Sequence, residues 1–214
     1  MFLVGSYEKL TPDALEETRR LSECGVELEP FDPEDASQTA WVLSSHVAVD
    51  ALFGVGLSRP IAPESVYARA VELMNRCRGT VIAADIASGV DADSGRVMGC
   101  AVKADRTITF TYQKVGHQVG DGALRAGAVE VLDIGIPRDL SAKLVCPVQT
   151  VESDFVRAAL PRRQTDGHKG TFGKVLVIGG AVGYTGAPYL TASAAARSGC
   201  GLVFLGVPAC IWPM

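Results

Sequence analysis

Short apolar segments that alternate with helical segments constrain the fold of this chain more than any other feature. Val47–Leu52 and Val81–Ile86 are apolar runs of strand length, and a helix is expected between them over Pro63–Arg78. Apolar residues in that helix recur at i, i+4, i+7, i+8 and i+11, which is the spacing of one helical face. Strands that alternate with helices favour a parallel sheet in an α/β fold.

Further elements follow the same pattern. Thr11 is a candidate helix N-cap, with Pro12 in the first helical position and Gly25 just past the end. The strands expected over Val47–Leu52 and Val81–Ile86 are apolar on both faces, as expected for a parallel sheet with helices on each side. We expect an α/β, Rossmann-like three-layer sandwich with a mostly parallel sheet. Additional strands are expected at Phe2–Val4, Val26–Leu28, Arg106–Tyr112 and Ala128–Ile134.

A second unit is expected after a polar, glycine-bearing stretch at 161–173. The segment KVLVIGG indicates a strand, AVGYTG a loop, Pro188–Ser198 a helix and LVFLGV a second strand, which together form one βαβ unit. A single βαβ unit cannot bury both faces of its sheet, so it docks on the first domain or belongs to something longer. The expected divisions are a domain over 1–140, a linker over 141–173 and the second unit over 174–214.

The composition and net charge of the chain indicate which kinds of binding partner to expect. Apolar residues make up 48% of the 214 residues, charged residues 21%, and the net charge is −4. This charge gives no electrostatic reason to expect nucleic acid or an anionic membrane as a partner. The N-terminus lacks the pattern of a signal peptide, and the six cysteines form no CxxC pair. We expect a cytoplasmic protein with reduced thiols and no membrane partner.

Two carboxylates lie near the ends of expected strands. Asp50 and Asp85 each precede a glycine-bearing loop, and the second loop also carries Ser88. In a doubly wound sheet, ligands bind outside the carboxyl ends of the strands. Each aspartate can therefore serve as a general acid or base, accept a hydrogen bond from a ligand hydroxyl or bind a hard cation with Ser88. The alternative is a structural role in capping the next helix.

The loop after the first of these strands is a candidate phosphate site. Glycines allow backbone N–H groups to approach a phosphate closely, and an arginine adds further donors. The alternative is that these glycines only make tight turns. The residues of this loop are Gly54, Val55, Gly56, Leu57, Ser58, Arg59 and Pro60.

Two other segments resemble known binding motifs but do not match them. The DADSG segment, Asp91 to Gly95, resembles the start of a calcium loop, but Gly95 and Val102 occupy positions five and twelve, where ligands are required. The loop IGGAVGYTG follows a strand but does not match GxGxxG in register, which disfavours an NAD-dependent oxidoreductase.

Several segments, taken in order and with their spacing, resemble a known family. DALFGVGLSRP, AADIASGVDADSG, KADRTITFTYQKVGH and VEVLDIGIP are similar to the NAD(P)H-hydrate epimerase domain. The stretch from His168 to Pro208 is similar to the opening of the ADP-dependent NAD(P)H-hydrate dehydratase domain, which has a ribokinase-like fold. The resemblance implies nicotinamide nucleotide repair, in which the R and S forms of hydrated NADH and NADPH are interconverted. ADP (or ATP) would serve only the complete dehydratase, and a homodimer is implied for the epimerase domain.

The resemblance also implies roles for individual residues. Asp50 and Ser88 correspond to ligands of a potassium ion, and Asp85 to the residue that touches the hydrated nucleotide and acts as acid or base. The Gly54–Pro60 loop corresponds to the phosphate-holding loop, and Ala187 to a hydrate contact in the dehydratase half. A bound cation would then explain a carboxylate at position 50.

The chain departs from the family pattern at three points. Ala87 stands where a proline is usual, no Asn-Asn-Gly-Gly-Asp-Gly loop occurs, and the dehydratase similarity stops before its nucleotide loop. The chain is therefore expected to be a fragment of the bifunctional enzyme. The alternative function is that of a non-catalytic, nucleotide-binding remnant of the same enzyme.

Overall fold

The structure is a computed structural model that describes residues 1–141, 143 and 148–212. The chain divides into two compact units, Met1–Val148 and Gln149–Met214, and each is described by itself.

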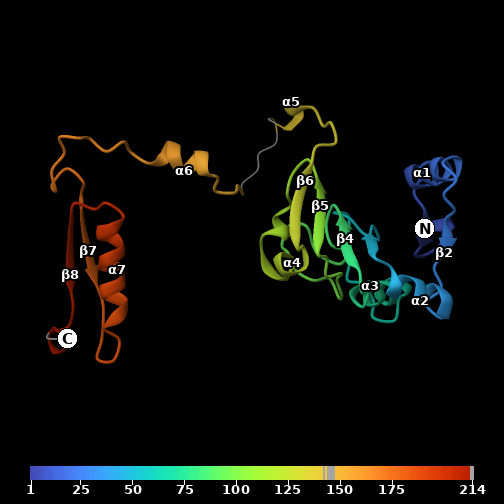
Figure 1. Cartoon of the computed structure of the whole chain (residues 1–214), viewed down its shortest axis with the longest axis horizontal. Helices are drawn as coiled ribbons and strands as arrows, with labels where there is room; N and C mark the ends of the chain where they lie inside the picture. The colour runs from blue at the N-terminus through green and yellow to red at the C-terminus, as the bar shows by residue number, and fades with distance from the viewer. Residues whose placement is uncertain (142, 144–147, 213–214) are drawn as a thin grey trace. The chain divides into compact units, whose positions relative to one another are not determined.

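A four-stranded parallel sheet forms the centre of the first unit (Figure 1). Its strands follow one another in space in the same order as in the sequence. The prediction of an α/β fold with parallel strands is confirmed. The strands are β3 (Val47–Asp50), β4 (Thr80–Ala84), β5 (Arg106–Phe110) and β6 (Ala128–Leu132).

One face of this sheet is well buried. Asp50 pairs in register with Ala83, and Ala83 pairs with Thr107, so these three side chains share a face. All three are fully buried. Helix α3 (Val66–Asn75) contributes Val71 to the core cluster that contains Val81 of β4 on this face. Asp50 thus points into the interior rather than into solvent.

The opposite face is open at β3. Val47 and Val49 are 53% and 61% exposed, although their strand predicts cover on both faces. Right-handed connections between parallel strands that follow one another in one direction all lie on one face of the sheet. The described connections therefore cover the Asp50 face, and no described element covers these two valines.

The first unit contains further helical elements and a second, two-stranded sheet. The bounds are η1 (Tyr7–Lys9), α1 (Pro12–Glu23), α2 (Ala36–Ser44), η2 (Val115–His117), α4 (Gly120–Arg125) and α5 (Arg138–Ser141). Strand β1 (Phe2–Leu3) pairs in parallel with β2 (Glu29–Pro30).

Helix α1 begins and ends as its sequence predicts. The Thr11 hydroxyl accepts a hydrogen bond from the N–H of Ala14, and Gly25 has a φ of 74°. The strand expected over Val26–Leu28 is wrong in position, because Glu29–Pro30 pairs instead. The N–H of Val26 donates to the Leu21 carbonyl and so belongs to the helix end rather than to a strand.

Helix α3 is shorter than the expected 63–78. Ser65 is its N-cap, and its hydroxyl accepts from the N–H of Ala68 at 3.2 Å. The helix ends at Asn75, before Gly79. Strands β3 and β4 also end earlier than their apolar runs, at Asp50 and Ala84. The early end of β4 places Asp85 in the loop that follows the strand, whereas Asp50 remains the last residue of β3.

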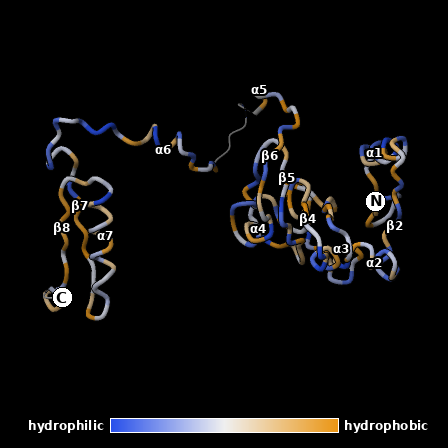
Figure 2. The backbone as a smooth tube through the Cα atoms, in the orientation of Figure 1, coloured by the Kyte–Doolittle hydropathy of each residue, from blue (hydrophilic) through white to orange (hydrophobic). Residues whose placement is uncertain are grey.

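The second unit contains the expected βαβ arrangement. Strands β7 (Lys174–Ile178) and β8 (Leu202–Gly206) are parallel and carry hydrophobic colour in Figure 2. Helix α7 (Gly186–Arg197) connects them, and η3 (Ala209–Ile211) follows. Helix α6 (Ser153–Ala159) lies within the stretch expected as a linker. The domain limits drawn from the sequence remain a prediction.

The described cysteines are free thiols, two of them exposed, and Cys146 lies outside the described residues. None of the helices in the described part of the chain is long and apolar enough to cross a membrane.

Candidate functional site

Both predicted carboxylates lie at the same edge of the main sheet. Asp50 is the last residue of β3, and Asp85 directly follows the last residue of β4. The two strands are parallel neighbours, so their carboxyl ends and the loops that follow meet at one edge. The structure thus places both aspartates at the ligand-binding edge of an α/β sheet.

Asp50 is held by the loop that follows β4. Its side chain is fully buried. Oδ1 accepts from the Ser88 hydroxyl at 2.6 Å and from the N–H of Leu52 at 3.3 Å, and Oδ2 accepts from the N–H of Ser88 at 2.8 Å. The two predicted metal-site residues are therefore in direct contact. Burial raises the pKa of Asp50, and the hydrogen bonds from Ser88 and Leu52 act against that rise.

The Ser88 hydroxyl joins the two loops. It accepts from the N–H of Phe53 at 2.9 Å and lies 2.6 Å from Asp50 Oδ1 and 3.2 Å from the Phe53 carbonyl oxygen. A hydroxyl has one proton, so it can fully satisfy only one of these two acceptors. Among the described residues, no charged side chain contributes to the pKa shift of Asp50. This cluster of oxygen atoms is electron-rich and lacks a positive partner within the described chain.

Asp85 is held by strand β5 in an unusual conformation. Its φ is 68°, in the left-handed region that non-glycine residues rarely adopt, and its N–H donates to the Ile108 carbonyl at 2.8 Å. Oδ1 accepts from the Thr109 hydroxyl at 3.0 Å and from the N–H of Phe110 at 3.1 Å. Strain of this kind concentrates at functional sites, where the surrounding structure maintains it.

Lys114 completes the Asp85 cluster and was not predicted from the sequence. Its Nζ forms an ion pair with Asp85 Oδ1, and both side chains are less than one-fifth exposed. Burial alone would raise the pKa of Asp85, but hydrogen bonds from Lys114, Phe110 and Thr109 outweigh it and lower the pKa below its usual value. Asp85 is therefore a carboxylate at neutral pH. The available signal was the position of Lys114, just after a strand that ends at the same edge.

Two buried polar atoms near this cluster lack partners within the described residues. They are Nε2 of His117 and Oγ1 of Thr111, a residue that also has a positive φ of 61°. His117 Nδ1 accepts from the N–H of Lys114 at 3.2 Å, so the proton of the neutral ring belongs on Nε2. Burial lowers the pKa of His117, which favours this neutral form. The backbone and the carboxylate of Asp85 both act against this shift, which places the ring beside the Asp85 cluster.

The predicted phosphate loop has glycines that the fold itself does not require. Neither Gly54 nor Gly56 has a positive φ, and a Cβ at either position would meet nothing within 4 Å. Gly89 differs, because its φ is 94° and a Cβ there would lie 1.9 Å from the Cys100 carbonyl oxygen. The first two glycines leave open backbone beside the site, whereas Gly89 is needed by the fold.

Ala187 belongs to the second unit. It lies in the first turn of α7, is exposed, and its carbonyl accepts from the Thr191 hydroxyl at 2.9 Å.

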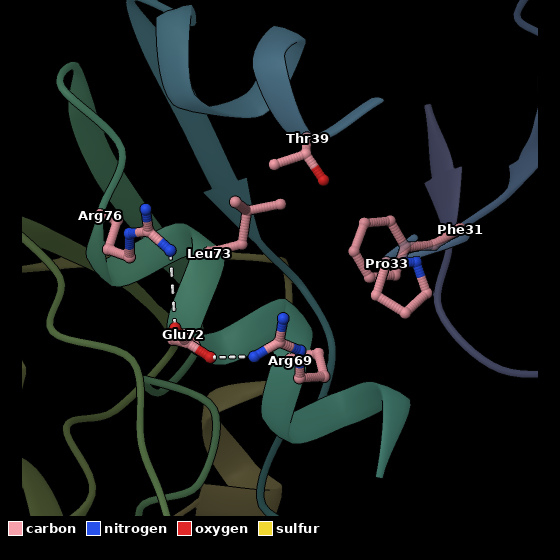
Figure 3. Close-up of a pocket in the computed structure, with 7 residues that line it drawn as sticks. All are labelled: Phe31, Pro33, Thr39, Arg69, Glu72, Leu73 and Arg76. Atoms are coloured by element: carbon pink, nitrogen blue, oxygen red, sulfur yellow. Dashed lines mark hydrogen bonds and ion pairs between the residues drawn. The ribbon is translucent and has the colours of Figure 1, made fainter. Parts of the chain in front are cut away.

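A small pocket of about 50 Å³ lies away from the predicted residues (Figure 3). Figure 3 shows Arg69 of α3 and Arg76, the C-cap of α3, turned toward Glu72, which pairs with them at 2.7 and 3.5 Å, respectively. The two arginines share one carboxylate, so the charges that line this pocket do not fully cancel and leave it positive. The other lining residues are Phe31, Pro33, Thr39 and Leu73.

Two known proteins that are similar to this chain carry the same name. The Bifunctional NAD(P)H-hydrate repair enzyme Nnr of Thermofilum pendens is 40% identical over 202 residues, which cover 94% of this chain and 37% of that protein. The enzyme of the same name from Moorella thermoacetica is 36% identical over 210 residues, covering 97% of this chain and 39% of that protein. The chain thus spans less than two-fifths of the length of these relatives.

A solved structure supports the fold. The crystal structure of the yeast protein YNL200c superposes with a TM-score of 0.53 at 19% identity, covering 72% of this chain and 62% of the yeast chain.

Two family models match successive parts of the sequence. The model described as NAD(P)H-hydrate dehydratase matches residues 175–212, within the second unit. The model described as YjeF-related protein N-terminus matches residues 1–116, more than half of the chain and all of the residues of both aspartate clusters. The chain belongs to the family of YjeF-related protein N-terminal domains.

Proposed function

We propose that the first unit interconverts the R and S forms of hydrated NADH and NADPH. The observation that carries this proposal is Asp85, an ionised carboxylate held in a strained conformation at the ligand-binding edge of the sheet. The names of the relatives, which are NAD(P)H-hydrate repair enzymes, supply the substrate class.

Epimerisation of the hydrate requires a side chain that can accept and donate a proton next to the nicotinamide ring. The hydrate carries a hydroxyl at C6 of the nicotinamide ring, next to the ring nitrogen. Inverting that carbon passes through a cationic or ring-opened species. In the ring-opening route, a carboxylate against the ring can accept the hydroxyl proton as the C6–N bond breaks and the carbonyl forms, and can deliver that proton to the ring nitrogen; the reverse steps close the ring on the other face of C6. Asp85 is the candidate for both tasks because it is ionised at neutral pH and its side chain is partly accessible.

The glycine loop is the proposed site for the nucleotide phosphates. Open backbone at Gly54 and Gly56 allows N–H groups to approach phosphate oxygens. Arg59 is exposed and can add charge-assisted hydrogen bonds. The contact residues proposed in this loop are Gly54, Val55, Gly56, Leu57, Ser58, Arg59 and Pro60.

We further propose that Asp50 and Ser88 hold a potassium ion together with the Phe53 carbonyl. These groups are hard oxygen donors that already converge, and one of the two acceptors facing the Ser88 hydroxyl lacks a proton. The donor set fits a monovalent cation, which would supply the positive charge that buried Asp50 lacks. No group of three or more His, Cys, Asp or Glu side chains in the described chain could hold a metal, which disfavours a transition-metal site there.

The second unit is proposed as the beginning of an ADP-dependent dehydratase domain, in which Ala187 would touch the hydrate. Its β7–α7–β8 arrangement and the match over residues 175–212 support this. A homodimer formed through the first unit and a cytoplasmic location are also proposed, on the family resemblance.

A coupled assay tests the epimerase proposal. The purified chain is mixed with the R hydrate of NADH, ADP and a complete dehydratase specific for the S hydrate, and NADH recovery is followed by absorbance. We expect recovery faster than spontaneous epimerisation allows, and its loss in Asp85→Asn. A chain that binds the hydrate without accelerating recovery would instead be a nucleotide-binding remnant.

Replacing the cation tests the proposed metal site in the same assay. We expect the rate to fall when potassium is exchanged for choline at constant ionic strength, and Ser88→Ala to weaken the response to added potassium. An equal rate in both salts would remove the potassium proposal and leave the epimerase proposal standing.

A further inference from the structure

We propose that Lys114 is a positioning residue for Asp85, which occupies Oδ1 of the carboxylate and leaves Oδ2 as the oxygen that meets the substrate. This inference rests on the proposed function and assigns a role to a side chain that the sequence did not single out.

The hydrogen bonds of Asp85 are one-sided. Lys114 Nζ, the Thr109 hydroxyl and the N–H of Phe110 all donate to Oδ1. No described residue donates to Oδ2, and Oδ2 is not among the buried atoms without a partner. With three donors fixed on one oxygen, the carboxylate cannot rotate without breaking them. The second oxygen is therefore both available and fixed in direction.

Lys114 is itself fully engaged within the protein. Besides Asp85, its Nζ lies 2.9 Å from the Thr109 hydroxyl and 3.2 Å from the carbonyl oxygens of both Phe110 and Tyr112. An ammonium group has three protons, and here it faces four acceptors. No N–H remains for a substrate, so Lys114 acts through Asp85 rather than on the reacting atoms.

The backbone of Lys114 is also anchored. Its N–H donates to His117 Nδ1 in η2 at 3.2 Å. Within the described chain, the titratable groups that face Asp85 are Lys114 and His117, and burial keeps His117 neutral. Thr109 and Phe110, on β5, contribute uncharged donors. Lys114 is therefore the single positive charge that favours the ionised form of Asp85, and its removal leaves burial to disfavour that form.

The test compares Lys114→Met with Lys114→Arg in the full chain. The pH dependence of kcat/KM for epimerisation is measured from pH 4 to 9. We expect the acid limb of the Lys114→Met profile to move up by about one pH unit or more, with a rate at neutral pH lowered by about tenfold. Lys114→Arg keeps the charge, so its acid limb should stay near that of the wild type. Coincident profiles for the wild type and Lys114→Met would overturn the proposal.

A second measurement separates this proposal from the proposed function. The carboxyl carbon of Asp85 is titrated by NMR in the same proteins, without substrate. An inactive wild type whose Asp85 titration moves up in Lys114→Met would refute the epimerase and keep the positioning role. An active wild type whose Asp85 titration is the same in Lys114→Met would refute the positioning role alone. If Lys114→Met does not fold, Lys114→Gln, which keeps a donor without charge, carries the same expectation.

Discussion

Gly54 and Gly89 lie in loops at the same edge of the sheet but have different roles. Gly89 combines a φ of 94° with a backbone oxygen 1.9 Å from any Cβ, whereas Gly54 has neither constraint. We expect Gly89→Ala to lower the free energy of unfolding by more than about 2 kcal/mol, because both strain and overlap oppose the new methyl group. Chemical denaturation measures this.

Gly54→Ala is the matched control. We expect its stability to stay within about 0.5 kcal/mol of the wild type. Its KM for the hydrate should rise by about tenfold, equivalent to about 1.4 kcal/mol, because the methyl group would occupy space that a phosphate approaches. An unchanged KM would show that the substrate does not contact this backbone.

His117 should make stability depend on pH. Burial lowers its folded pKa below the unfolded value of about 6.5, so the unfolded chain binds the proton more readily. The contribution of neutral His117 to the free energy of unfolding is fully present above pH 6.5 and declines as the pH falls below that value. Between pH 7.5 and 5, the wild type should lose up to about 2 kcal/mol more than His117→Asn, whose amide oxygen can replace Nδ1 as the acceptor for Lys114. Denaturant titrations at both pH values decide this, and equal losses in the two proteins would contradict it.

The sequence could predict some site residues and not others. Asp50 and Asp85 stand out because carboxylates are unexpected beside buried strands, and the structure places both at the carboxyl edge of the sheet. The only signal for Lys114 was its position after a strand, and a lysine at such a position is ordinarily solvated. Its burial depends on the turn after β5, where Thr111 has a positive φ, and no local pattern foretells that turn. The roles of the predicted residues remain proposals.

Among the elements, helix α3 connects β3 to β4 and packs one of its faces into the core. It buries Ala70, Val71 and Leu73, and Ser65 caps its start. We expect Ser65→Ala to lower the free energy of unfolding by about 1 kcal/mol, because the N–H of Ala68 loses its acceptor. Ser6 caps η1, which buries no residue, so Ser6→Ala should have a smaller effect on thermal unfolding. Equal losses would mean that capping of α3 is not coupled to its packing.

Periodicity predicted which elements exist better than where they end. Helix α1 matched its cap signals because Thr11, Pro12 and Gly25 act locally. Strand β2 was misplaced because its pairing with β1 is a contact between distant residues that hydropathy does not encode. The exposed face of Val47 and Val49 likewise depends on the order of strands in space.

At the scale of the whole molecule, the two units match different families. The dehydratase match is confined to residues 175–212, and the relatives are more than twice the length of this chain. We expect the 214-residue chain to form no NADH from the S hydrate when ADP is added without a partner enzyme. The measurement is NADH absorbance over time, and recovery above the rate without protein would contradict this expectation.

The central claim is that Asp85 epimerises a hydrated nicotinamide nucleotide. The most direct test starts from the pure S hydrate of NADH and follows the appearance of the R hydrate by chromatography, with no second enzyme present. The account predicts that the chain brings the two forms to equilibrium faster than buffer does, and that Asp85→Asn, with an unchanged circular dichroism spectrum, matches buffer. Equal rates with and without the wild-type chain, or full activity in the variant, would contradict it.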